Sequence, residues 1–272
     1  MKTKKIAYHY TSVESLFKIL GIRGDSIYCR ATHAHFLNDP SEYEYAIEIF
    51  LESMEEYEKQ KNIKIRKSDL RDEAINFLSG LSQMSGDPFL MSFSMSPDDL
   101  AMWRTYGKDG SGVAIGFDSD MLSKKEDEPN TKFIECIYDK RTLISELVKF
   151  WESEYDKINI EKNNNSTSST RLLFSIFDLC YAAKRKPYAS ENEWRLCKNK
   201  TVEDKVEFRV SQNLIIPFIK HKFEKEIIKE IILGPCSNEQ LAKKSIELFL
   251  EEYDYDLKKM LINASEISYR QL

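Results

Sequence analysis

The chain has 272 residues, of which 42% are hydrophobic and 31% charged, and its formal net charge is -5. This length can bury a core without disulfide support, and the composition is that of a globular protein. The densest basic cluster is Lys184–Lys186, at the end of a predicted helix, where cations favour the helix dipole. The charge distribution therefore disfavours non-specific binding of nucleic acid.

The five cysteines and the lack of long apolar runs indicate the compartment. The cysteines are odd in number, widely spaced and free of CxxC pairs, which favours reduced thiols and excludes a structural zinc site of cysteines. The chain has no secretion-signal core and no apolar run near the ~20 residues that span a membrane. We expect a cytoplasmic protein without a membrane segment.

The first 120 residues predict strands and helices in an irregular order. A capping box at Thr11–Glu14 begins a helix that Gly21 ends, and Asp39 and Glu42 mark the start of a helix running to about residue 60. A further helix is predicted over 68–81, and Ser96–Asp99 starts another that closes at Gly107. The predicted strands are 5–10, 26–30, 89–95 and 112–117.

The remainder is richer in strands. We expect helices at 141–158, 172–186 and 237–253, and a mobile polar loop at 163–170. The predicted strands are 133–138, 193–197, 206–210, 214–219, 227–233 and 259–263. Because strands and helices mix without βαβ alternation, the predicted class is α+β. Residues 1–272 are expected to form a single domain, since neither half shows a complete strand-rich core.

Two predicted strands carry polar residues on one face. Ser92 and Ser94 alternate with apolar residues, so they share a face. Glu191, Glu193 and Arg195 should likewise share the face opposite Trp194 and Leu196. These side chains line a cleft in the functional interpretation. In the alternative interpretation the serines face solvent and Glu193 simply pairs with Arg195.

The first strand ends in a second candidate cluster. His9, Tyr10 and Thr11 lie where the amide groups at the N-terminus of the next helix also point. The alternative is a structural histidine that donates to a backbone carbonyl. Trp103 and Tyr106 are candidates for the core, a cleft wall or an aromatic shelf.

Metal binding has one weak candidate. His33 and His35 are expected to alternate on one strand face with Asp39 nearby. Without a clear third and fourth ligand they predict no bound metal, and a metal-dependent hydrolase is a distant third function.

Several motifs resemble the bacterial family of domain of unknown function 2971. These motifs are Tyr8–Ser12, Leu37–Glu42, Met91–Ser94, Met102–Gly107, Gly112–Asp118, Glu191–Arg195 and Ile232–Pro235. They follow one another in the order of that family and span most of the chain. The resemblance names a family and no reaction.

A second resemblance implies a chemistry. The order His9-Tyr10-Thr11, Ser92-Phe93-Ser94 and Glu191-Asn192-Glu193 is similar to the three motifs of the ADP-ribosyltransferase-like superfamily. The resemblance implies a mixed or antiparallel split sheet with flanking helices and NAD bound in a cleft. It implies that Glu193 is catalytic with Glu191 assisting. It also implies that His9, Tyr10, Thr11, Ser92, Ser94 and Tyr106 bind the nucleotide.

Two classes of function follow. The first is an NAD-using enzyme that transfers ADP-ribose to an unknown protein or nucleic-acid acceptor, or cleaves the glycosidic bond of NAD. The resemblance implies a toxin or phage-defence effector in that case. The second is a non-catalytic ligand-binding or sensor module on the same fold. In the enzyme, His9, Ser94 and Glu193 should converge on one pocket.

Overall fold

The computed structural model describes residues 5–37, 39, 42–63, 88–161, 179, 181–211, 213–236 and 238–269. They form two compact units: Met1–Ala34, Pro88–Phe133 and Ser190–Leu272 in the first, and His35–Asp87 and Ile134–Ala189 in the second. The single domain expected from the sequence stays a prediction. The helix expected at 68–81 and the loop at 163–170 lie outside the described residues.

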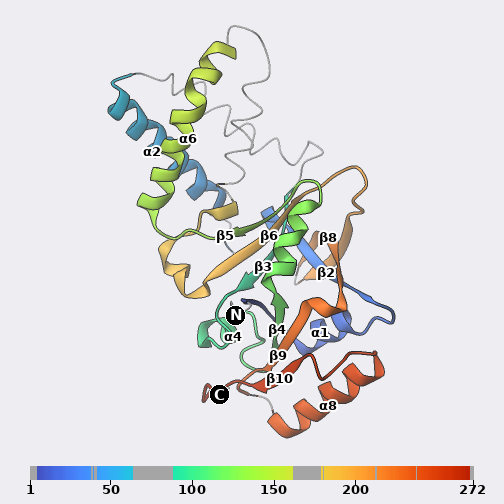
Figure 1. Cartoon of the computed structure of the whole chain (residues 1–272). Coiled ribbons are helices and arrows are strands. Elements are labelled where there is room, and N and C mark those ends of the chain that lie inside the picture. Colours follow the sequence, from blue (N-terminus) through green and yellow to red (C-terminus); the bar gives the residue numbers. More distant parts are fainter. Residues whose placement is uncertain are drawn as a thin grey trace. The chain divides into compact units, whose positions relative to one another are not determined.

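Ten strands of the described residues form one open, mixed sheet (Figure 1). Only β10 and β9 are parallel among the pairs whose register is described. The α+β class and the mixed sheet are confirmed. The order is β10 (Leu261–Ala264), β9 (Ile228–Leu233), β4 (Val113–Asp118), β1 (Ile6–Thr11), β3 (Pro88–Ser94), β2 (Ser26–His33), β8 (Leu214–Glu224) and β7 (Glu207–Ser211), while β6 (Glu193–Asn199) pairs with β3 and with β5 (Thr131–Glu135).

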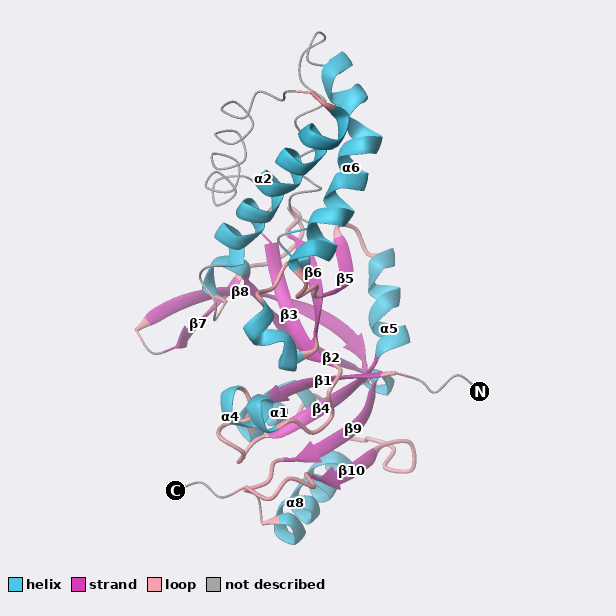
Figure 2. Ribbon diagram, turned by 90° about the vertical axis from the view of Figure 1, so that its left-hand side faces the viewer, coloured by secondary structure: helices cyan, strands magenta, loops and turns pink. Residues whose placement is uncertain are grey.

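Helices of the first unit pack on both faces of this sheet. One face forms the main core, where α1 (Val13–Leu20), α5 (Ser119–Ser123) and α8 (Glu239–Glu252) bury Leu16, Leu122 and Leu250. On the other face α4 (Leu100–Thr105) buries Trp103 against Tyr8 and Tyr10. Figure 2 shows the helices and strands from a second side. Alternation along each strand explains the two layers, because neighbouring residues point to opposite faces.

Local capping signals were mostly read correctly. Asp99 accepts from the amide of Met102, and Asn238 accepts from that of Leu241, so both helices are capped within the segments where their starts were predicted. At α1 the prediction was wrong by one residue. Ser12 is the cap, accepting from the amide of Ser15, and Thr11 is the last residue of β1. α2 is described from Glu42, and residues 38, 40 and 41 lie outside the described residues, so the cap expected at Asp39 stays a prediction.

Some predicted boundaries shift, and short 3-10 helices fill the gaps. β5 covers Thr131–Glu135 rather than 133–138. The helix predicted at 172–186 lies partly outside the described residues, and Lys186 begins a 3-10 helix instead. The 3-10 helices are η1 (Ala34–Phe36), η2 (Lys124–Asp127), η3 (Lys186–Glu191) and η4 (Lys225–Ile227).

The second unit contains two long helices, α2 (Glu42–Lys61) and α6 (Lys140–Glu161). Their contact is built around Trp151, which is buried, stacks at 5.2 Å from Phe50 and donates from its indole nitrogen to the Ser53 hydroxyl at 3.0 Å. The hydroxyl satisfies the only polar atom of the indole ring, so a large aromatic side chain is buried without a desolvation penalty.

Candidate functional site

The ladder between β1 and β3 opens into a fork in the first unit. β1 pairs with β3 only at Tyr8 and Ser94, near the end of β3. The same edge of β3 pairs with β2 at Leu90 and Phe89. Between these two contacts, the backbone of β3 around Ser92 is outside both ladders. A sheet that opens in this way leaves backbone polar groups that need other partners.

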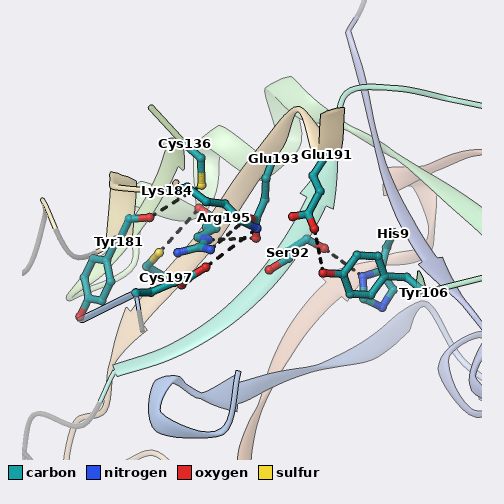
Figure 3. A network of polar contacts seen from close by, with 11 residues as sticks. His9, Ser92, Tyr106, Cys136, Tyr181, Lys184, Glu191, Glu193, Arg195 and Cys197 are labelled. Carbon is teal, nitrogen blue, oxygen red and sulfur yellow. Dashed lines mark hydrogen bonds and ion pairs between the residues drawn. The ribbon is translucent and has the colours of Figure 1, made fainter. Parts of the chain in front are cut away.

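His9 supplies the partner at the fork. Its Nδ1 donates to the carbonyl oxygen of Ser92 at 3.0 Å (Figure 3). The ring meets the edge of Phe93 with centroids 6.2 Å apart. Because a carbonyl oxygen only accepts, this bond places the imidazole proton on Nδ1 and leaves the lone pair on Nε2. Burial lowers the pKa of His9 below its ordinary value, which favours the neutral ring.

On β3 and β6 the polar residues share one face. Ser94 lies opposite Glu193 and Ser92 lies opposite Arg195, and directly opposed residues of an antiparallel pair point the same way. The other face of these strands belongs to the main core, with Phe93 and Leu196 buried. The predicted faces, Ser92 with Ser94 and Glu193 with Arg195, are confirmed, and the register of β3 with β6 puts both pairs on the same side of the sheet.

Glu193 is held by Arg195 rather than open to a cleft. Arg195 Nε donates to Glu193 Oε1 at 2.9 Å and its Nη2 donates to Oε2 at 3.0 Å, forming a bidentate pair. The exposed fractions of the two residues are 5% and 2%. Such a pair neutralises both charges in a desolvated setting. The alternative interpretation of Glu193, a carboxylate paired with Arg195, is the arrangement that the structure has.

Glu191 is not a residue of β6, so strand alternation does not fix its side chain in the way the prediction assumed. It ends η3, and β6 begins only at Glu193. Between them Asn192 has a φ of 44°, in the left-handed region that asparagine adopts more readily than most residues. This turn breaks the strand alternation. The Glu191 carboxylate contacts Tyr106, which packs against the cluster of Tyr8 and Trp103 on the side of the sheet that Glu193 also occupies.

The Glu191 segment is bonded to two other elements. Tyr106, which follows α4, donates from its hydroxyl to Glu191 Oε1 at 3.1 Å. The Ser94 hydroxyl donates to the Glu191 carbonyl oxygen at 2.7 Å, and the Asn192 carbonyl accepts from the amide of Met95 at 2.9 Å. Glu191 is half-buried. The Tyr106 hydroxyl thus orients its carboxylate.

Tyr10 has structural contacts, and the nucleotide contact expected of Thr11 stays a prediction. The Tyr10 hydroxyl donates to the carbonyl of Ser96 at 2.8 Å and accepts from the amide of Asp99 at 3.3 Å. Both uses fix the start of α4, and Tyr10 is 5% exposed. Thr11 ends β1 and is half-buried. Tyr10 therefore has a structural contact where a nucleotide contact was expected.

The expected pocket of His9, Ser94 and Glu193 does not form in the expected way. Tyr8, and not His9, lies opposite Ser94, while His9 pairs with Ile115 of the main core. Neighbouring strand residues point to opposite faces, so His9 and Glu193 lie on opposite faces of the sheet. Both residues contact β3: the Ser92 carbonyl accepts from His9, and Ser94 lies opposite Glu193.

The sequence reading missed a second buried carboxylate on this face. Glu230 of β9 accepts from the Tyr8 hydroxyl at 2.7 Å and from the Asn263 amide at 2.7 Å. Gly116 lies between Tyr8 and Glu230 in the ladder. A Cβ there would approach the Glu230 Cβ to 3.1 Å. An isolated glycine inside a predicted strand is the sequence signal for such a place, where side chains of the two neighbouring strands pass over the glycine.

His33 and His35 do not have the arrangement that the metal hypothesis assumed. His33 ends β2 and is buried edge-on to Phe89, whereas His35 is exposed within η1. A 3-10 turn separates them, so they do not alternate on one strand. Within the described ranges, no three side chains of His, Cys, Asp or Glu form a group that could hold a metal ion. The absence of a bound metal stays a prediction.

The chain is thus a mixed α+β protein with a forked sheet and polar side chains around the fork. Residues 102–196 match the model of a family described as protein of unknown function (DUF2971). That segment includes α4, β4 and the Glu191–Arg195 motif. No curated protein and no solved structure matches the chain. No described helix is long and apolar enough to cross a bilayer.

Proposed function

We propose that this chain cleaves NAD, transferring ADP-ribose to an acceptor or releasing it to water. The observation that carries the proposal is the strand order β1–β3–β6, with the β1–β3 ladder open beyond Tyr8 and Ser94. The motif residues His9, Ser94 and Glu191 lie on or beside these strands. A split between the first and second motif strands is what the ADP-ribosyltransferase-like resemblance implies.

The reaction needs a carboxylate near the ribose. The bond between nicotinamide nitrogen and ribose C1′ breaks, its electron pair leaves with nicotinamide, and positive charge develops on the ribose. Water or an acceptor nucleophile then bonds to C1′ and loses a proton. A fixed negative charge close to the ribose lowers the energy of that transition state.

The contacts favour Glu191 over Glu193 for this role. Glu193 is buried and its charge is neutralised by Arg195, so little of its field reaches a ligand. Glu191 is half-buried, and the Tyr106 hydroxyl orients its carboxylate. The resemblance assigns the opposite roles, and the two assignments differ in a measurable way.

His9 fits binding better than proton transfer. With the proton on Nδ1 and the ring neutral, Nε2 can accept from a ribose hydroxyl at the fork. The free thiols among the described cysteines suit the cytoplasmic location proposed with this activity.

A second candidate is the non-catalytic binding or sensor module. The observation that favours it is the Glu193–Arg195 pair, which occupies the position that the resemblance reserves for the catalytic carboxylate. In this function the fork binds a nucleotide without breaking it.

The test is nicotinamide release from NAD by the full chain, with and without cell lysate as a source of acceptors. Glu191→Gln should reduce turnover by roughly 10²–10³-fold, the size of one lost electrostatic stabiliser, while NAD binding survives. Its unfolding midpoint should change little because the glutamine amide keeps an oxygen that can accept from Tyr106. The matched control is Glu251→Gln, an exposed carboxylate of α8, which should behave as wild type.

The outcomes separate the candidates. Glu193→Gln with the larger loss of turnover at unchanged stability would return the catalytic role to Glu193. Wild type that releases no nicotinamide under either condition, yet is stabilised by NAD, favours the binding module. Absence of both release and stabilisation rejects NAD as the ligand.

A further inference from the structure

β7 forms an open edge of the sheet. The strand order ends at β8–β7, and within the described residues β7 pairs with β8 alone. Its five residues, Glu207–Ser211, contain no proline, and their register with β8 is regular. The outer N–H and C=O groups of such a strand are a template for another strand.

Apolar side chains are exposed along this edge. Phe208, Val210 and Ile215 have exposed fractions of 65%, 78% and 68%. The register pairs Val210 with Ile215 and Phe208 with Pro217, so all four share one face. Alternation along β8 puts Ile219 of the main core on that same face. The core face of the sheet therefore continues into an uncovered apolar patch, a feature typical of interaction surfaces.

The opposite face of β7 carries an incomplete charge arrangement. Arg209 is half-buried, and no ion-pair partner for it is found in the part of the chain that the structure describes. Burial, and then the like charge of Arg30, lower the pKa of Arg209. Two residues away, Glu207 already contacts Lys220 at 2.9 Å on the outer part of the strand. A carboxylate beside Arg209 would stabilise the charge of its half-buried guanidinium group.

We propose that β7 pairs antiparallel with β7 of a second copy of this chain, with Phe208 on the two-fold axis. Glu207 then lies opposite the partner subunit's Arg209, and Arg209 lies opposite the partner subunit's Glu207. The two aromatic rings meet on the apolar face. The pairing joins the sheets of two copies and satisfies the open edge.

The sequence of β7 selects this register. Glu207-Phe208-Arg209 is self-complementary when it runs against itself about Phe208. A shift of one residue sets Phe208 opposite an arginine and mixes the apolar and charged faces. Centring on Arg209 sets two guanidinium groups opposite one another, and like charges at this distance destabilise a strand pair. Charge complementarity thus favours a second copy over an unrelated strand.

The experiment is sedimentation of the full chain over a range of concentrations. Wild type should reach twice the 31.9 kDa mass of the chain. Glu207→Arg and Arg209→Glu should each raise the dimer dissociation constant by roughly tenfold or more, because symmetry repeats each like-charge contact. The double variant Glu207→Arg/Arg209→Glu recreates the pairs in reverse and should dimerise again.

Two controls keep loss of dimer distinct from loss of fold. Arg209→Glu removes the repulsion from Arg30, so its thermal unfolding midpoint should not fall. Lys222→Glu reverses an exposed charge elsewhere on β8 and should leave the dimer intact.

Three results would overturn the pairing: wild type that remains a monomer at all concentrations, single charge reversals that still dimerise, or a double variant that does not recover. Slow hydrogen exchange of the β7 amides in a monomer would assign the edge to another part of the same chain.

Discussion

The fork and the β7–β8 end of the sheet differ in whether their buried polar groups have hydrogen-bond partners. At the fork, buried polar side chains are partnered: Glu193 by Arg195, Tyr8 by Glu230, and His9 by the Ser92 carbonyl. Towards the other end, the buried Nε2 of His221 on β8 has no hydrogen-bond partner. Beyond it, the apolar side chains of β7 are exposed.

The difference shows where the fold depends on its surroundings. A polar network whose members satisfy one another is rigid and costly to disturb, because removing one member strands another in a low dielectric. A region with unmet polar and apolar groups responds instead to pH and to a partner. Changes at the fork should therefore cost most, and changes at the β8 end should depend on conditions.

The largest effect is expected from breaking the buried ion pair. Arg195→Met removes the bidentate partner of a buried carboxylate, which should lower the free energy of unfolding by about 3–5 kcal/mol. Glu193→Leu/Arg195→Met removes both charges and should recover most of that loss. Urea unfolding measures both. A cost below about 1 kcal/mol for the single variant would mean that water reaches Glu193.

A second effect depends on pH and comes from His221. Burial, followed by the charge of Lys198, lowers the pKa of His221 to about 4. Below pH 6.5 the unfolded chain binds a proton that the folded chain refuses. The contribution of neutral His221 to the free energy of unfolding is therefore fully present above pH 6.5. It is lost as the pH falls towards 4, by on the order of 3 kcal/mol.

His221→Leu should flatten most of the pH dependence of stability in that window. His9, whose pKa burial also lowers, keeps part of the slope. The exposed His35 provides the control, since His35→Gln should leave the slope as in wild type. An unchanged slope in His221→Leu would contradict the buried, neutral state of this ring.

The smallest effect is expected at Tyr106, which orients Glu191. Tyr106→Phe removes one hydrogen bond to a half-buried carboxylate, worth about 1 kcal/mol. Nicotinamide release should fall by roughly five- to tenfold in kcat with KM little changed. The unfolding midpoint should move by less than that of Arg195→Met. A rise in KM alone would show that Tyr106 contacts the nucleotide instead.

The sequence predicted what depends on local patterns. The starts of α4 and α8, the α+β class, and the faces shared by Ser92 with Ser94 and by Glu193 with Arg195 all follow from side-chain chemistry and from the two-residue period of a strand. These signals act over a few residues. They are therefore visible without knowledge of the partners in space.

The errors arose where one residue changes the direction of the chain or where pairing is remote. The left-handed backbone at Asn192 ended the strand before Glu191, and an asparagine between the two glutamates is a residue type that favours such a turn. His9 moved to the other face because the register of β1 with β4 and β3 decides which residue is opposed. No pattern within β1 itself contains that information.

The strand order also has a consequence for how the chain is made. β2 pairs with β8, whose residues follow it by roughly 200 positions. At ~5–20 residues per second, a ribosome needs about 10–40 s to deliver that partner. During this interval β2 and the apolar residues of β1 emerge without most of their native neighbours. Such remote pairing slows folding and exposes strand edges to aggregation. The yield of soluble protein should therefore depend on chaperones and on low growth temperature more than the stability of the finished sheet suggests.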